Sequence, residues 1–193
     1  MEHYFTRKPT SSEEIHHIRT ELRGRKLLFE SSSGVFSKKR IDFGSRILVE
    51  TVVLKNQDTV LDVGCGYGVC GIALSFSCGY AFLMDINLRA CTLTKKNIVL
   101  NEVKNASVVC GSPDCLRSFC DVAVMNPPIR AGKKIVFDLI LSARRCLNPG
   151  GQLYLVARTK QGAKSIFTFM EGHFTRVSYA SLQSGYRVIE ARV

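Results

Sequence analysis

Short apolar runs alternate with longer amphipathic segments along most of the chain. In the amphipathic segments the apolar residues recur at helical spacing, and the apolar runs are short enough for strands. Strands that alternate with helices in this way predict a parallel sheet with helices on both faces. The predicted strands cover residues 58–64, 80–85, 106–110, 121–126 and 152–157, and the predicted helices cover 45–54, 69–77, 88–101, 134–147 and 162–172.

The two ends of the chain depart from this alternation. Residues 16–22 and 25–31 are strand-like runs on either side of Gly24, and they predict a β-hairpin. Residues 174–182 and 185–193 predict a closing hairpin, which would complete a mostly parallel, seven-stranded sheet with an antiparallel last strand. The pattern is therefore that of an α/β sheet with a small N-terminal hairpin in front of it.

The chain has 193 residues, which is enough for one domain with a full hydrophobic core. No linker or internal repeat interrupts it, so we expect a single domain over residues 1–193. Its N-terminal extension would cover residues 1–45 and its core residues 46–193. The N-terminal segment has no apolar signal core, and no run of about eighteen apolar residues occurs anywhere. The sequence therefore predicts a soluble, cytoplasmic protein without membrane contact.

Eight cysteines are present, and their spacing favours neither disulfides nor a metal site. They lie inside apolar runs or at the edges of such runs, as small core residues do. There is no Cys-x-x-Cys pair and no cysteine–histidine cluster with zinc spacing, so we expect no bound metal. These cysteines are Cys65, Cys70, Cys78, Cys91, Cys110, Cys115, Cys120 and Cys146.

The chain is strongly basic, with 27 lysines and arginines against 16 acidic residues and a net charge of +11. The excess is uneven: between residues 126 and 164 there are eight basic residues and one acidic residue, Asp138. A basic field of this kind suits a polyanion such as nucleic acid. It is also compatible with an ordinary solvated surface.

A glycine-rich turn, VLDVGCGYGVCG at residues 60–71, joins the first strand of the alternating region to its helix. Glycines here permit a tight turn and let a ligand approach the backbone, and Asp85 at the end of the next strand can accept ribose hydroxyls. The third glycine of a dinucleotide site is replaced by Val69, and Asp62 would repel a pyrophosphate. Asp62 suits a ligand with a cationic amino acid end, or else it only ties down the turn.

Several strings in the sequence resemble those of one enzyme family. LDVGCGYG followed by DIN resembles the cofactor site of class I S-adenosylmethionine-dependent methyltransferases, and NPPI at residues 126–129 resembles the motif of members that methylate planar amino nitrogens. Together with GVFSKKRIDFGSRILVE, KQGAKS and GYRVIEA, these strings are similar to the 16S ribosomal RNA guanine-N2 methyltransferase C family, a methyltransferase small domain family, in its short single-domain form. The larger members carry a duplicated N-terminal half that this chain lacks.

The resemblance implies a Rossmann-like, doubly wound fold and S-adenosylmethionine as cofactor. It implies that the substrate is RNA, either 16S ribosomal RNA or a 30S assembly particle, methylated at guanine N2. The residues that it places around the cofactor are Asp62, Gly64, Cys65, Gly66, Gly68, Asp85, Ile86, Ser112 and Asn126. The catalytic motif would be Asn126, Pro127, Pro128 and Ile129.

The chemistry of an amino nitrogen explains why such a motif ends a strand. The lone pair of an exocyclic amine is delocalised into the ring, and accepting hydrogen bonds from both N–H groups would point it at the methyl donor. We expect the side-chain oxygen of Asn126 and the carbonyl of Pro127 to be the two acceptors, with Pro128 holding that carbonyl in place. Proline carries no N–H, so we expect no local donor to compete for them. Catalysis would be positioning and electrostatics. Alternatively, the prolines only end the strand.

The sequence departs from the family pattern at two positions. Ile129 stands where base methyltransferases often stack an aromatic ring on the target. Either Ile129 makes apolar contact only, or a ring comes from elsewhere, with Phe36 and Tyr186 as candidates unless they are core residues. Ser112 stands where relatives carry an acid that meets the cofactor adenine, and Asp114 is the candidate replacement. Adenine recognition is therefore the open part of the cofactor site.

Contacts to RNA phosphates are expected from basic residues around the motif, namely Arg130, Lys133, Lys134, Arg158 and Lys160. The N-terminal extension would supply any further RNA contact, or serve only as a solvated lid on the sheet. Other readings keep the chemistry and change the target, to an adenine amino group in RNA or DNA or to a protein glutamine. A last alternative is an RNA-binding protein without catalytic activity on the same fold.

Overall fold

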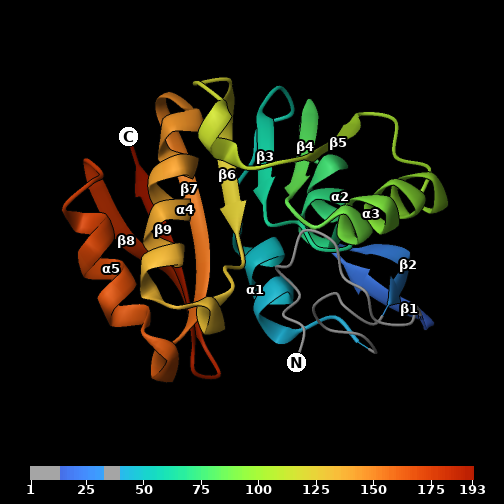
Figure 1. Cartoon of the computed structure of the whole chain (residues 1–193), viewed down its shortest axis with the longest axis horizontal. Helices are drawn as coiled ribbons and strands as arrows, with labels where there is room; N and C mark the ends of the chain where they lie inside the picture. The colour runs from blue at the N-terminus through green and yellow to red at the C-terminus, as the bar shows by residue number, and fades with distance from the viewer. Residues whose placement is uncertain (1–13, 33–39) are drawn as a thin grey trace.

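The computed structural model describes residues 14–32 and 40–193, and a seven-stranded sheet runs through its centre (Figure 1). The strand order is β5-β4-β3-β6-β7-β9-β8. Their bounds are β3 (Thr59–Val63), β4 (Tyr80–Asp85), β5 (Ala106–Cys110), β6 (Cys120–Met125), β7 (Leu147–Arg158), β8 (Arg176–Gln183) and β9 (Tyr186–Arg192). The pairs from β5 to β7 are parallel, and β9 pairs antiparallel with both β7 and β8. The mostly parallel sheet with an antiparallel last strand is thus confirmed.

Helices cover both faces of the sheet because each strand alternates its buried side chains between two cores. Along β3, Val60 packs into one core and Leu61 into the other, as the two-residue period of a strand requires. The first core contains α1 (Phe43–Thr51), α2 (Val69–Ser75) and α3 (Leu88–Leu100), and the second contains α4 (Lys133–Cys146) and α5 (Ala163–Glu171). This is the doubly wound arrangement expected from the sequence.

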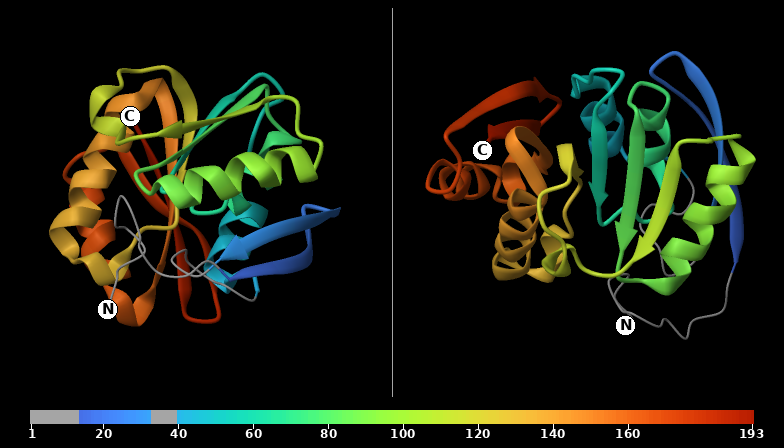
Figure 2. Two further views of the ribbon diagram at one scale, coloured as in Figure 1. Left: turned by 45° about the vertical axis from the view of Figure 1, so that its right-hand side comes forward. Right: turned by 90° about the horizontal axis from the view of Figure 1, so that it is seen from above.

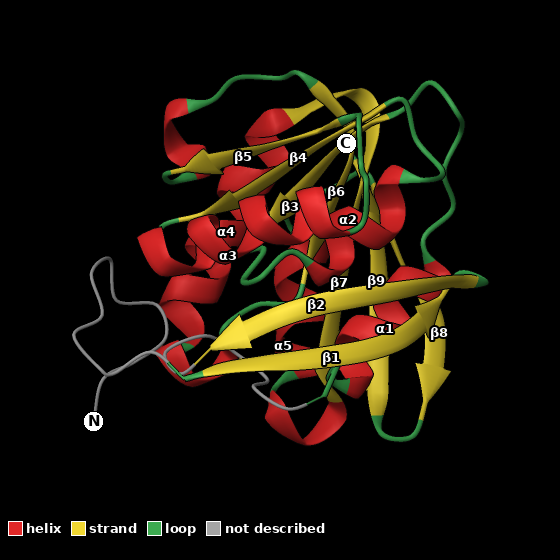
Figure 3. Ribbon diagram, turned by 90° about the vertical axis from the view of Figure 1, so that its right-hand side faces the viewer, coloured by secondary structure: helices red, strands yellow, loops and turns green. Residues whose placement is uncertain are grey.

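The N-terminal hairpin forms a separate two-stranded sheet of β1 (Ile15–Leu22) and β2 (Arg25–Ser32). Its turn residues Arg23 and Gly24 have φ values of 49° and 72°, as a two-residue hairpin turn requires. The hairpin lies in front of the helices on its side of the sheet (Figure 3). It and α5 lie at opposite ends of the molecule (Figure 1, Figure 2).

Two asparagines on α3 attach this hairpin to the core. The side-chain oxygen of Asn97 accepts from the Glu30 backbone N–H at 2.7 Å, and its nitrogen donates to the Glu30 carbonyl at 2.9 Å. Asn101 makes the same pair of bonds with Leu28, at 2.9 and 2.7 Å. The exposed edge of β2 is therefore satisfied by side chains, which an unpaired strand edge needs.

Some predicted boundaries were wrong, and capping or register explains each difference. Helix α1 starts at Phe43 rather than at residue 45, because Asp42 accepts from the Ser45 backbone N–H at 3.1 Å and begins the helix earlier. Strand β7 starts at Leu147 rather than at residue 152, because Leu147 pairs with Cys120 ahead of a register shift. In the described part of the chain, no helix is long and apolar enough to cross a membrane.

Candidate active site

A cavity of about 410 Å³ opens where β3, β4 and β6 end. Strand order reverses between β3 and β6, and the carboxyl ends of parallel strands at such a reversal are the usual ligand site of this architecture. The walls come from the β3 turn, the ends of β4 and β6, the turn after β5, and helices α1 and α4. Segments that lie far apart in the sequence therefore meet at one edge of the sheet.

The glycine turn forms one wall of the cavity. Gly64 and Gly66 line it with φ values of 72° and 58°, which L side chains rarely adopt, and a Cβ at either position would meet nothing within 4 Å. The backbone there is open to a ligand. Gly68, by contrast, is not among the lining residues; a Cβ at Gly68 would lie 2.9 Å from both Ile72 and Thr94. Close packing explains that third glycine.

Asp85 closes the turn from the end of β4. One of its carboxylate oxygens accepts from the Gly66 backbone N–H at 2.9 Å, and the other accepts from the Asn87 backbone N–H at 2.8 Å. Burial raises the pKa of the Asp85 carboxyl, while these hydrogen bonds lower it. Each carboxylate oxygen can accept a second bond, so the group remains able to take two hydroxyls. Ile86, 42 % exposed, also lines the cavity.

Asp62 and Cys65 are the other polar groups that the sequence placed at this wall. Asp62 is 3 % exposed, lines the cavity, and accepts from the Gly71 backbone N–H at 2.8 Å. Burial and, to a smaller extent, the nearby Asp85 raise the pKa of Asp62 to about 7, although the hydrogen bond from Gly71 lowers it. Burial likewise raises the pKa of the Cys65 thiol. Asp62 thus ties down the first turn of α2 and faces the cavity as well.

The opposite wall is the end of β6. Asn126, Pro127 and Pro128 line the cavity there. The Asn126 side-chain nitrogen donates to Ser45 Oγ at 2.9 Å and lies 3.3 and 3.4 Å from the two carboxylate oxygens of Asp42. Asp42 and Ser45, at the start of α1, also line the cavity. Sequence reasoning missed both residues, although an aspartate just before a helical pattern is a capping signal.

The Pro127 carbonyl does have a local hydrogen-bond donor, contrary to expectation. It accepts from the Ile129 backbone N–H at 2.8 Å, across Pro128 with φ −74° and ψ 75°. This is an inverse γ-turn, and it fixes the direction of the carbonyl. A carbonyl oxygen has two lone pairs, so one stays available for a substrate donor.

Ile129 does not line the cavity. It begins a short 3-10 helix, η2 (Ile129–Ala131), and packs against the second core. The apolar wall near the motif comes instead from Ile135 and Leu139 of α4. These two residues belong to no sequence motif, and they reach the cavity only because α4 packs beside β6.

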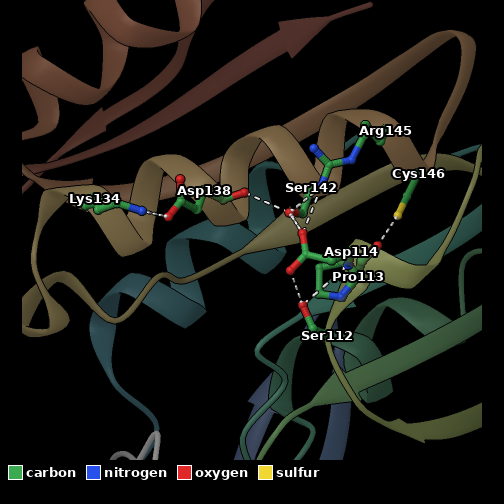
Figure 4. A network of polar contacts seen from close by, with 8 residues as sticks. All are labelled: Ser112, Pro113, Asp114, Lys134, Asp138, Ser142, Arg145 and Cys146. Atoms are coloured by element: carbon green, nitrogen blue, oxygen red, sulfur yellow. Dashed lines mark hydrogen bonds and ion pairs between the residues drawn. The ribbon is translucent and has the colours of Figure 1, made fainter.

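Ser112 lines the cavity, whereas Asp114 is not among the lining residues and points toward Ser142 and Arg145 of α4 (Figure 4). Ser112 donates to one Asp114 carboxylate oxygen at 2.7 Å. The other oxygen accepts from Ser142 and, at 2.8 Å, from Arg145. These hydrogen bonds, led by the one from Ser142, lower the pKa of Asp114. Asp114 therefore does not present a carboxylate to the cavity in place of the missing acid.

The basic residues named from the sequence are all exposed, on the segment after β6 and at or just after the end of β7. Lys134 pairs with Asp138 at 2.9 Å. Arg158 donates to the Tyr186 hydroxyl at 2.7 Å and lies 4.8 Å over its ring, which partly occupies that guanidinium. Tyr186 is not among the lining residues, and Phe36 lies outside the described residues. The remaining members of this set are Arg130, Lys133 and Lys160.

Among the described residues, no group of three or more histidine, cysteine, aspartate or glutamate side chains could hold a metal ion. Cys110 is an exposed free thiol, and the buried free thiols are Cys65, Cys70, Cys78, Cys91, Cys120 and Cys146. The polar groups at the cavity are carboxylates, an amide, hydroxyls, thiols and backbone groups.

Comparison with known proteins gives a consistent set of matches. The model of the methyltransferase small domain family matches residues 26–190. The chain is 35% identical to the uncharacterized protein YbxB of Bacillus subtilis, over 99% of this chain and 98% of that protein. It is 27% identical to the ribosomal RNA small subunit methyltransferase C of Colwellia psychrerythraea, over 88% of this chain and 48% of that one. It thus spans about half the length of that relative.

A solved structure with the same fold is the 16S rRNA N2 G1207 methyltransferase of T. thermophilus, in complex with AdoMet and guanosine. Its TM-score is 0.81 at 21% sequence identity, and the match covers 95% of this chain and 52% of that one.

Proposed function

The chain belongs to the methyltransferase small domain family, and we propose that it methylates an exocyclic amino group of ribosomal RNA, with guanine N2 of the small-subunit RNA as the target. One observation carries the proposal. The Asn126–Pro127–Pro128 segment and the glycine turn with Asp85 line the same cavity. The glycine turn with Asp85 suits a nucleoside cofactor, and the Asn126–Pro127–Pro128 segment suits a target amine, so both ligands would meet in this cavity.

The cofactor half of the cavity fits S-adenosylmethionine. Gly64 and Gly66 leave the backbone uncovered, Asp85 can accept two ribose hydroxyls, and Asp62 can face an ammonium group. Ser112 stands beside the expected adenine position with a hydroxyl rather than an acid. When bound, the cofactor supplies a sulfonium methyl group to the nucleophile.

The substrate half consists of two acceptors on a rigid turn. The Asn126 oxygen and the second lone pair of the Pro127 carbonyl can each take one N–H of a target amine. The inverse γ-turn and the hydrogen bonds on the Asn126 nitrogen fix both groups before substrate arrives. A polar group oriented in advance costs no reorganisation during the reaction, which is how it lowers a barrier. The amine proton can leave to solvent after methyl transfer.

The proposed substrate is a base extruded from RNA, because an amine inside a helix cannot reach such a cavity. Ile135 and Leu139 supply an apolar wall against which the base can lie. Arg130, Lys133 and Lys160 stand exposed on the neighbouring segments, where they can contact phosphates.

The deciding experiment is transfer of a tritiated methyl group to 30S particles, naked 16S RNA, 23S RNA and tRNA, followed by nucleoside analysis. We expect N2-methylguanosine in small-subunit RNA. Label in N6-methyladenosine, in the large-subunit RNA or in tRNA would assign a different target to the same chemistry. Label in protein alone, or no transfer to any of these substrates, would refute the proposal.

The matched variant is Asn126→Ala. It should keep cofactor affinity and RNA affinity close to those of the parent, because the other contacts to cofactor and RNA remain and the lost acceptor acts mainly in the transition state. Its single-turnover rate should fall by about a hundred- to a thousandfold, the loss that follows removal of one preorganised polar group. A rate equal to that of the parent would reduce Asn126 to a strand terminator.

A further inference from the structure

The Asn126 amide has two ends of nearly the same shape and opposite hydrogen-bonding character. Turning the amide by half a turn exchanges its oxygen, an acceptor, for its nitrogen, a donor. Shape alone therefore does not decide which end faces the cavity. Only the oxygen end can accept from a target amine, so activity depends on how this choice is made.

The hydrogen-bond partners of the Asn126 amide determine its orientation. Its nitrogen lies 3.3 and 3.4 Å from the two carboxylate oxygens of Asp42 and 2.9 Å from Ser45 Oγ. The Ser45 hydroxyl can donate or accept, so it tolerates either orientation. The carboxylate oxygens of Asp42 are hydrogen-bond acceptors, so they would oppose the amide oxygen in the turned orientation. Within the described residues the Asn126 oxygen accepts no hydrogen bond, and it is left to the cavity.

Asp42 is itself held firmly in place. It is the N-cap of α1, with φ −69° and ψ 150°, and it accepts from the Ser45 backbone N–H at 3.1 Å. The helix behind it buries Ile47, Leu48 and Val49 in the first core. A Cβ at Gly44 would lie 3.0 Å both from the capping Asp42 oxygen and from the Tyr186 ring, so the surroundings are close-packed. The carboxylate therefore has little freedom to move away from the amide.

We propose that Asp42 is a positioning residue that fixes the orientation of the Asn126 amide, so that its oxygen faces the target amine. This inference rests on the proposed role of Asn126 as an acceptor. Asp42 acts through Asn126 and need not touch the substrate. The cap and the amide contact are served by the same carboxylate, which links the start of α1 to the end of β6.

The test begins with Asp42→Asn. Asparagine caps a helix about as well as aspartate, so α1 should persist. If the introduced asparagine keeps its side-chain oxygen on the Ser45 N–H, its nitrogen points toward Asn126. That nitrogen is a donor, so it favours the Asn126 orientation in which the Asn126 nitrogen, rather than the oxygen, faces the cavity. We expect single-turnover rates at saturating cofactor to fall from about tenfold up to the loss seen for Asn126→Ala. The cofactor dissociation constant should stay within about twofold, because no cofactor contact is assigned to Asp42.

An exchange of partners supplies the rescue. Asn126→Asp alone places a second carboxylate against Asp42, and like charges at this distance oppose one another. The double variant Asp42→Asn/Asn126→Asp restores one donor and one acceptor, with the acceptor again available to the cavity. It should therefore methylate faster than either single variant. A role limited to helix stability predicts no such rescue. The matched control is Asp58→Asn, which alters a carboxylate that bonds the Lys55 backbone N–H ahead of β3, and it should keep the parental rate.

A measurement without substrate separates this inference from the proposed function. The ¹⁵N-labelled side-chain amide of Asn126, identified by its absence in Asn126→Asp, should change its proton shifts in Asp42→Asn and not in Asp58→Asn. An unchanged amide spectrum would overturn the inference, as would parental turnover in Asp42→Asn. The inference would also fail if Asp42→Asn lowered only the cofactor affinity, or if the double variant methylated no faster than the two single variants. A parent that methylates no RNA would refute the proposed function, while the amide spectrum would still show whether Asp42 orients Asn126.

Discussion

Cofactor affinity should depend on pH through Asp62. Burial, helped by the neighbouring Asp85 and opposed by the hydrogen bond from the Gly71 N–H, raises the pKa of this carboxyl from its ordinary 3.8 to about 7. Half of the Asp62 side chains therefore carry a proton at neutral pH when no cofactor is bound. A cationic amino end of S-adenosylmethionine next to Asp62 favours the ionised form. Binding should thus expel the proton from Asp62.

The pKa of Asp62 sets the direction in which cofactor affinity changes with pH. Well above pH 7 the Asp62 carboxyl is ionised and cofactor affinity should approach a plateau, whereas near and below pH 7 part of the binding free energy is used to remove the proton. At pH 5 only about one carboxyl in a hundred is ionised, so affinity should be lower than the plateau by up to about a hundredfold. Without cofactor, the free energy of unfolding should fall as the pH rises, because a buried acid with a raised pKa destabilises the fold as it ionises. Between about pH 4 and pH 7 that loss amounts to roughly 4 kcal/mol at most.

Calorimetric titration between pH 5.5 and 7.5, in buffers of different ionisation enthalpy, measures both the affinity and the proton released. At the upper limit most cofactor amino groups are still protonated, since an α-amino group has a pKa of about 7.7–8.0. Asp62→Asn should abolish the pH dependence, and Asp58→Asn should preserve it. A dissociation constant that does not vary with pH, with no proton released, would refute the reasoning. Asp62 would then only tie down Gly71.

Two further predictions concern packing and charge. Gly71→Ala should destabilise the fold by about 1–3 kcal/mol in urea unfolding, since the new Cβ would lie 2.4 Å from Leu83, whereas Gly111→Ala, with nothing within 4 Å, should have little effect. Replacing Lys133 and Lys134 by alanine should flatten the salt dependence of RNA binding by about 0.7–0.9 log units for each phosphate that is no longer neutralised. Equal stabilities of the two glycine variants would contradict the first expectation. RNA binding by the parent protein that hardly varies with salt would contradict the second.

The order of elements was predictable because it rests on local periodicity. The apolar runs and the helical spacing between them indicated strands such as β4 and helices such as α3 almost to the residue. The docking of the hairpin was not predictable. It depends on Asn97 and Asn101 being one helical turn apart and opposite the edge of β2, which no local pattern reveals.

The candidate site divides in the same way. Residues within a motif, such as Gly64, Asp85 and Asn126, reached the cavity because the motif and the strand end coincide. Asp42 and Leu139 are lining residues that lie outside any motif, and they arrive only through the packing of α1 and α4. Ile129 belongs to the expected motif but does not line the cavity, because the turn at Pro128 directs it toward the second core.

The spacing between the two halves of the site is set by the sheet itself. Strands β3 and β6 are parallel neighbours, and Val63 pairs with Met125. Gly64 and Asn126, each the next residue, therefore leave the sheet side by side, about 4.8 Å apart in the direction of the hydrogen bonds. A slip of one residue would turn every side chain of β6 to the other face, and the two alternating cores oppose that slip. Buried apolar residues that never touch a ligand thus fix how far the amine acceptor stands from the cofactor turn.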